Sequence, residues 1–144
     1  GCKQVIFKDP HRGDAIEELG GMNVFFIFGK ENKIVTPELT GTILEGVTRS
    51  SLIQLAKDRG MTVEERAITL TEWREGVANG DITEIFACGT AAVVAPIGKL
   101  KAEDFEIPAP TEHFGEISKS LREELVGIQL GTVEDRHGWM TRLI

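Results

Sequence analysis

Apolar and polar positions follow two different periods along this chain, and the first part has the pattern of strands. Asn23–Phe28 is a nearly continuous apolar run, which is typical of a strand buried on both faces. The polar stretch Gly29–Asn32 and the β-rich Lys33–Thr36 then predict a hairpin loop and a return strand. Gln4–Lys8 predicts an earlier strand, and the Asp, Pro and Gly content of Asp9–Gly13 predicts a turn after it.

Helical spacing appears in the middle of the chain and again near its end. Thr48–Arg59 has apolar residues at helical spacing, with Thr48 as the expected N-cap and Gly60 beyond the last turn. Gly115–Leu130 predicts a second, amphipathic helix. Its apolar stripe consists of Ile117, Leu121, Leu125 and Ile128.

A third, shorter helix lies between two predicted strands. Thr69 and Glu72 form the capping-box pattern T-x-x-E, which predicts a short helix through Val77 that Gly80 ends. Met61–Arg66 alternates like a strand, and Ile82–Cys88 predicts another strand that ends at the next glycine.

The remaining segments complete a mixed pattern. Val93 and Val94 predict a strand before Pro96, and Gly98–Glu112 predicts a long polar connection. Because strands and helices do not alternate regularly, we expect one α+β domain (irregular α/β) over residues 1–144 rather than a Rossmann fold. Neither a G-x-G-x-x-G motif nor a P-loop is present in the sequence.

Charge and cysteine content narrow the possible partners. The chain of 144 residues carries a net charge of −7 without a basic stripe, which argues against nucleic acid as a partner. No apolar run approaches the roughly 20 residues that span a membrane. Cys2 and Cys88 are far apart and the three histidines are scattered, so we expect no metal site and a reducing, cytoplasmic location.

Three stretches have the residue types of a binding site. "GVT" at Gly46–Thr48 offers a hydroxyl and the free N–H groups of a helix start, which suit an anion, although an ordinary N-cap has the same pattern. "CGTAAV" at Cys88–Val93 interrupts the β pattern between two predicted strands. This interruption is either a nest of backbone N–H groups that binds an anion or a tight bend in the sheet. "IEELGGMNVFFIF" places Glu17 and Glu18 before the most apolar strand. A carboxylate there is either the partner of a bound cation or part of a solvated hairpin end.

Two anion sites and one carboxylate suit a ligand with a phosphate at one end and a protonated nitrogen at the other. Pyridoxal phosphate has this form. Its protein partners are an acid at the pyridine nitrogen, N–H groups around the phosphate, and a lysine.

Four blocks in order resemble branched-chain amino-acid aminotransferases, which are fold-type IV pyridoxal-phosphate enzymes. The blocks are "EELGGMNVFFIFG", "IVTPELTGTILEGVTR", "EIFACGTAAVVAPIG" and "GIQLGTVEDRHGWM", and the resemblance runs from Gln4 to Trp139. The Met-Asn and Gly-Ile-Gln sequences favour branched-chain enzymes over D-amino-acid transaminases and aminodeoxychorismate lyases of the same fold. The implied architecture is the C-terminal portion of the cofactor domain of the D-amino-acid-aminotransferase-like fold, a pseudo-barrel of strands with flanking helices.

The resemblance also implies roles for individual residues that contact the cofactor. Glu18 corresponds to the glutamate that pairs with the pyridine nitrogen, and strand alternation would turn Glu17 away from it. Val47 and Thr48 correspond to the helix-start residues that bind the phosphate.

The glycine-threonine block has two implied roles. Gly89 and Thr90 correspond to the second phosphate contact, and Thr90 and Ala91 correspond to the turn that holds the carboxylate of the substrate. These positions would therefore join cofactor binding to substrate binding.

The Schiff-base lysine of the family lies well upstream of the glutamate, and neither Lys3 nor Lys8 occupies its position. We therefore expect no catalytic residue in this chain. It would lack both the region of the Schiff-base lysine and the small N-terminal domain, and it would be inactive alone. The intact enzyme would be a homodimer that transfers an amino group between leucine, isoleucine or valine and 2-oxoglutarate. Two alternatives remain: a D-amino-acid transaminase or lyase of the same fold, and a noncatalytic anion-binding or structural domain.

Overall fold

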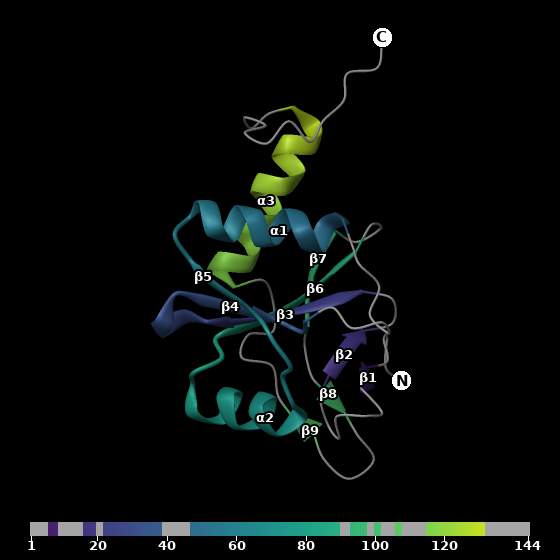
Figure 1. The fold of residues 1–144 in the computed structure, drawn as a ribbon, viewed down its shortest axis with the longest axis vertical. Coiled ribbons are helices and arrows are strands. Elements are labelled where there is room, and N and C mark those ends of the chain that lie inside the picture. The colour runs from purple at the N-terminus through teal and green to yellow at the C-terminus, as the bar shows by residue number, and fades with distance from the viewer. Residues whose placement is uncertain are drawn as a thin grey trace.

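A five-stranded sheet is the centre of the computed structural model, which describes residues 6–8, 16–19, 22–38, 47–89, 93–97, 100–101, 106–107 and 115–131 (Figure 1). The strand order is β5-β4-β3-β6-β7. Neighbouring strands are antiparallel except that β4 and β5 are parallel. The strands are β3 (Asn23–Phe28), β4 (Lys33–Thr36), β5 (Thr62–Glu65), β6 (Glu84–Gly89) and β7 (Val93–Pro96).

Helices cover both faces of this sheet. α1 (Val47–Asp58) and α3 (Glu116–Leu130) lie on one side, and α2 (Leu70–Asn79) lies on the other (Figure 1). Two small antiparallel pairs lie beside the main sheet: β1 (Ile6–Lys8) with β2 (Ile16–Leu19), and β8 (Leu100–Lys101) with β9 (Glu106–Ile107).

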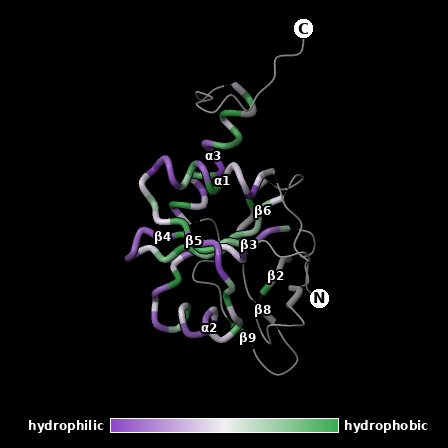
Figure 2. The backbone as a smooth tube through the Cα atoms, in the orientation of Figure 1, coloured by the Kyte–Doolittle hydropathy of each residue, from purple (hydrophilic) through white to green (hydrophobic). Residues whose placement is uncertain are grey.

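The central strand β3 divides the core into two layers, because its side chains alternate between the two faces. Phe25 packs in the layer under α1 and α3, where its ring stacks on that of Phe86 with centroids 5.1 Å apart. Phe26 packs in the layer toward α2 and meets Trp73 edge to face. Hydrophobic residues accordingly concentrate along the central strands (Figure 2). All six positions of β3 are buried, which confirms the pattern predicted for Asn23–Phe28.

The α2 helix begins and ends with local signals. The Thr69 hydroxyl accepts a hydrogen bond from the backbone N–H of Glu72 at 3.0 Å, which confirms the predicted cap. The Glu72 carboxylate pairs with the Arg66 guanidinium, with its two oxygens 2.9 and 2.8 Å from Nη1 and Nη2. Gly80 ends the helix with φ of 83°, a left-handed conformation that glycine adopts at little cost.

The α3 helix begins against a side chain from the sheet. Glu84, at the start of β6, is 6% exposed, and its carboxylate accepts hydrogen bonds from the backbone N–H groups of Ile117 and Ser118 and from the Ser118 hydroxyl. Gly115 is the N-cap, and a Cβ there would overlap the Glu84 side chain. The absence of a side chain at position 115 therefore lets a carboxylate of the sheet cap this helix.

The structure changes several boundaries expected from the sequence. α1 begins at Val47, so Thr48 lies in the first turn, and its prediction as the N-cap is wrong. The connection predicted for Gly98–Glu112 contains the small pair β8–β9. The strands predicted over Lys33–Thr36 and Ile82–Cys88 are confirmed as β4 and, beginning at Glu84, as β6. The turn predicted at Asp9–Gly13 lies outside the described residues.

The mixed α and β composition is confirmed, and the described strands form one open five-stranded sheet with two small pairs beside it. The pseudo-barrel and the C-terminal placement stay predictions. The apolar stripe of α3 is confirmed, since Leu121, Leu125 and Ile128 are buried and Ile117 packs against them half-buried.

Candidate functional site

One edge of the sheet, here called the site edge, collects the first residue of β3 and the last residues of β4, β5 and β6. It forms because β3 runs antiparallel to β4 and β6, while β5 runs parallel to β4. The residues at this edge are Asn23, Thr36, Glu65 and Gly89. The Thr36 hydroxyl donates to the Val24 carbonyl at 2.7 Å and so ties the end of β4 to the start of β3.

The start of α1 lies against the site edge. Val47 and Thr48 are its first two residues, and Thr48 is half-buried. The first four N–H groups of an α-helix have no partner within the helix and carry partial positive charge. Val47 and Thr48 therefore offer the backbone N–H groups of a helix start, which suit an anion, even though Thr48 is not the N-cap. Gly46 lies outside the described residues.

The "CGT" stretch meets the same edge at the end of β6. Gly89 pairs with Val93 of β7, and Cys88 pairs with Asn23 of β3. A Cβ at Gly89 would lie 3.3 Å from Cγ of Met22, a tight contact. The segment that enters β3 and the segment that leaves β6 therefore pack together. Thr90 and Ala91 lie outside the described residues.

Glu18 lies in β2 opposite Phe7 of β1. The register shifts between Phe7 and Lys8, since Lys8 pairs with Ile16, so the extra residue in β2 is Glu17. This bulge interrupts strand alternation and removes the basis on which Glu17 was expected to face away from Glu18. Bulges are common beside binding sites, where they redirect a side chain.

The start of β2 is firmly placed on the α2 side of the sheet. The backbone N–H of Ile16 donates to the carbonyl of Ile68 at 2.8 Å, and the Ile16 side chain is buried. β2 precedes β3 directly in the chain, so Glu18 is only a few residues from Asn23 at the site edge. β2 contacts β3, the strand whose first residue lies at the site edge.

Arg49 is a site residue that sequence reasoning did not single out. It is the third residue of α1 and is 2% exposed. Its Nη2 donates to the Pro37 carbonyl at 3.1 Å and to the Glu65 carboxylate at 2.9 Å, so it connects the first turn of α1 to the ends of β4 and β5. Its Nε is buried and has no hydrogen-bond partner among the described residues.

Cys88 is fully buried, and the charge of the Arg49 guanidinium acts on its thiol. Burial raises the pKa of its thiol to about 12, although the charge of Arg49 acts in the opposite direction. The thiol is therefore neutral near pH 7 and a poor nucleophile. This confirms its interpretation as a small buried residue rather than a reactive one.

The described residues fit a phosphorylated ligand at the site edge. The start of a helix and a guanidinium N–H that no described residue accepts lie together at the beginning of α1, and both favour an anion. Val47 and Thr48 would hold the phosphate of pyridoxal phosphate, with Gly89 nearby at the end of β6. Glu18 of β2 is the acid type that a pyridine nitrogen requires.

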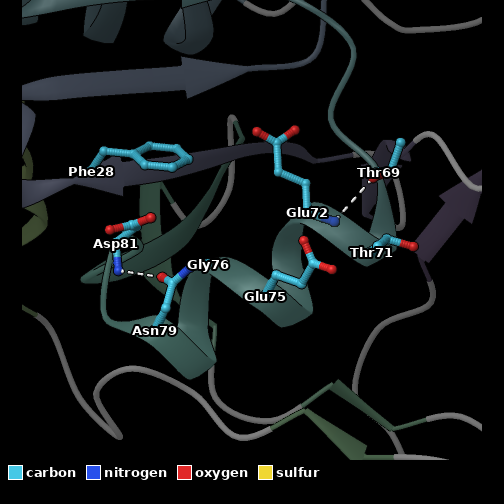
Figure 3. A pocket seen from close by; sticks show the side chains of 8 residues that line it. All are labelled: Phe28, Thr69, Thr71, Glu72, Glu75, Gly76, Asn79 and Asp81. Atoms are coloured by element: carbon cyan, nitrogen blue, oxygen red, sulfur yellow. Dashed lines mark hydrogen bonds between the residues drawn. The ribbon is translucent and has the colours of Figure 1, made fainter.

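A separate hollow of about 290 Å³ lies along α2 near Phe28, at the opposite end of β3 (Figure 3). The carboxylates of Glu72 and Glu75 point in different directions in this hollow (Figure 3). Among the described residues there is no group of three His, Cys, Asp or Glu side chains that could hold a metal ion. An acidic lining also disfavours phosphate, so this hollow does not compete with the site edge.

No helix in the described part of the chain is long and apolar enough to cross a membrane.

Comparison with known proteins identifies the family. The model of the family described as amino-transferase class IV matches residues 1–100, and the chain therefore belongs to this family. The branched-chain-amino-acid aminotransferase of Mycolicibacterium smegmatis is 50% identical over 145 residues, a match that covers 99% of this chain and 39% of that protein.

Solved structures of aminotransferases share the fold. The branched-chain amino acid aminotransferase of Escherichia coli matches with a TM-score of 0.79 and 28% identity, over 99% of this chain and 42% of that one. The branched-chain aminotransferase of Thermobaculum terrenum, solved in its PLP form, matches with a TM-score of 0.75 and 31% identity, over 98% of this chain and 42% of that one. The chain thus spans about two fifths of the length of these relatives.

Proposed function

We propose that this chain is part of the cofactor-binding domain of a pyridoxal-phosphate-dependent branched-chain aminotransferase. The observation that carries the proposal is the 50% identity with the Mycolicibacterium smegmatis enzyme along 99% of the chain. The meeting of the α1 start and the β6 end with the first residue of β3 at the site edge supports it independently.

The cofactor contacts follow from this arrangement. The backbone N–H groups of Val47 and Thr48, together with the Thr48 hydroxyl, bind the phosphate, and Gly89 and Thr90 provide the second phosphate contact. Glu18 holds a proton on the pyridine nitrogen, because a carboxylate beside that nitrogen favours its protonated form. Bound pyridoxal phosphate supplies the electron sink that makes amino-group transfer possible.

The substrates are a branched-chain amino acid and 2-oxoglutarate, and the turn at Thr90 and Ala91 holds the substrate carboxylate. In this proposal the chain is the C-terminal part of the large domain. The anchoring lysine and the small domain belong to a part of the longer protein outside residues 1–144. We call this longer protein the intact enzyme, and we propose that it is a cytoplasmic homodimer.

A substrate comparison tests the reaction. The intact enzyme is expected to transfer the amino group of leucine to 2-oxoglutarate and to leave D-alanine and aminodeoxychorismate unchanged. Turnover of D-alanine or aminodeoxychorismate in place of leucine would assign it to another branch of the fold. Absence of all three activities in a protein that binds no pyridoxal phosphate would point to the noncatalytic alternative.

The location of the lysine has a direct test. Borohydride reduction of the intact enzyme with its cofactor, followed by peptide mass spectrometry, is expected to place the label on a lysine outside these residues. A stoichiometric label within them would overturn this part of the proposal.

A further inference from the structure

Arg49 is a buried cation at a position where helix electrostatics disfavour one. It is the third residue of α1 and is 2% exposed. The first turn of a helix already carries partial positive charge, so a cation there is repelled rather than stabilised. Removing a guanidinium from water adds a further cost unless its charge and its donors are matched.

The described residues match this charge only in part. The ion-pair partner of Arg49 among them is Glu65 at 2.9 Å, whose side chain is 45% exposed, so water screens its charge. Nη2 also donates to the Pro37 carbonyl. Nε is buried, and the part of the chain that the structure describes gives it no hydrogen-bond partner. In the covalent structure of arginine, Nε is nearer than Nη2 to the helix backbone.

Cys88 of β6 adds no countercharge. Burial raises the pKa of the Cys88 thiol to about 12, although the charge of Arg49 acts to lower that pKa, so the thiol stays neutral at physiological pH. Among the described residues, the start of α1 therefore combines the partial positive charge of a helix terminus, a guanidinium and an N–H donor without a partner. The countercharge that contacts this guanidinium there is one half-exposed carboxylate, that of Glu65. A dianion bound there would relieve both the electrostatic and the hydrogen-bonding deficit.

We propose that Arg49 is a positioning residue for the phosphate group bound at the start of α1. Its guanidinium holds the first turn against the ends of β4 and β5, and its charge increases the affinity of that turn for a phosphate dianion. This inference rests on the proposed function, because it takes the phosphate to be that of the cofactor.

The test compares pyridoxal 5'-phosphate with pyridoxal, which lacks the phosphate. The dissociation constants of both are measured by absorbance titration of the intact enzyme, and their ratio isolates the contribution of the phosphate. In Arg49→Met this preference for the phosphorylated ligand should fall about tenfold, as expected for the loss of one nearby charge. Arg49→Lys, which keeps the charge, should restore most of the preference.

Glu65→Gln provides a test in the opposite direction. Removing the carboxylate that partly neutralises Arg49 should raise the preference for pyridoxal 5'-phosphate roughly threefold. Glu64→Gln is the matched control, because Glu64 is the preceding residue of β5 and its carboxylate contacts Lys33 and Arg66 instead of Arg49. The control should leave the preference unchanged.

The outcomes separate this inference from the proposed function. An unchanged preference in Arg49→Met, in a protein that binds both ligands, would overturn the role of Arg49 and leave the cofactor assignment standing. If Arg49→Met does not fold, Glu65→Gln decides: a raised preference supports the role, and an unchanged one overturns it. Failure of the unmodified protein to bind pyridoxal 5'-phosphate would overturn both proposals.

Discussion

Glu84 caps α3 through Ser118, which lies 34 positions later in the chain. Its carboxylate accepts hydrogen bonds from the Ser118 backbone N–H at 2.9 Å and from the Ser118 hydroxyl at 2.6 Å, and the backbone N–H of Ile117 adds a third at 3.2 Å. The same residue belongs to β6, which carries Gly89 to the site edge. The position of α3 on the sheet is therefore tied to a strand of the candidate site.

Replacement of Glu84 by alanine should destabilise the protein by about 2–3 kcal/mol, because buried donors of α3 would lose a charged acceptor. Urea unfolding of the intact enzyme measures the loss, and hydrogen exchange of the peptide covering residues 115–131 should locate it in α3. Glu116→Ala is the matched control in the same turn, where the exposed acid contributes at most about 1 kcal/mol through the helix dipole. Equal effects of the two variants would contradict the capping role.

Gly115 and Glu84 should be energetically coupled. Gly115→Ala alone should destabilise the protein by about 1–3 kcal/mol, because the new methyl group would displace the Glu84 side chain from its buried hydrogen bonds. In the Glu84→Ala background the same change should cost almost nothing, since the overlapping side chain is absent. A double-mutant cycle of unfolding free energies measures this coupling, and additive effects would show that the two residues act separately.

Cys88 should make the free energy of unfolding depend on pH above neutrality. Its pKa rises from 9.0 to about 12 on folding, so the unfolded chain loses the thiol proton first as the pH rises. Between these values the folded protein binds more protons, and stability therefore falls with increasing pH. The contribution of the neutral Cys88 thiol to the free energy of unfolding is fully present below pH 9. Above pH 9 it decreases by at most about 1.4 kcal/mol per pH unit.

Urea unfolding at several pH values from about 8 to 11 measures the free energy of unfolding of the unmodified enzyme and of Cys88→Ala. Comparing the two proteins isolates the contribution of the Cys88 thiol. The difference in stability between the two proteins should shrink steadily as the pH rises. A difference that does not change with pH would mean that the thiol ionises equally easily in the folded and unfolded states. In the native enzyme near pH 7, Cys88 should also resist alkylation by iodoacetamide until urea unfolds the protein.

Helices and strands that are determined by residues close together in sequence could be predicted. The run Asn23–Phe28 identifies a doubly buried strand because no polar face interrupts it. Thr69 and Glu72 locate the start of α2, since cap and partner are three residues apart. Val47, Thr48 and Gly89 reach one edge of the sheet as the proposed phosphate site requires, although the contacts of their backbone groups with a cofactor stay a prediction.

Features that depend on distant contacts could not be predicted. The bulge at Glu17 follows from how β2 pairs with β1, and the cap that Glu84 gives α3 links residues far apart in sequence. The two-residue strands β8 and β9 are too short to show a period. For Arg49 one signal was available: a cation in the first turn of a helix opposes the helix dipole and suggests a special environment.

The central claim is that Glu18 is the acid of a pyridoxal-phosphate site in a branched-chain aminotransferase. The most direct test is the rate of leucine-dependent amino transfer to 2-oxoglutarate by the intact enzyme and its Glu18→Gln and Glu17→Gln variants. Loss of the charge at position 18 should lower kcat by about 10²–10³-fold, as expected when one key electrostatic contact is removed. The adjacent Glu17→Gln variant should stay within about threefold of the unmodified enzyme. Near-normal turnover by Glu18→Gln would contradict the claim.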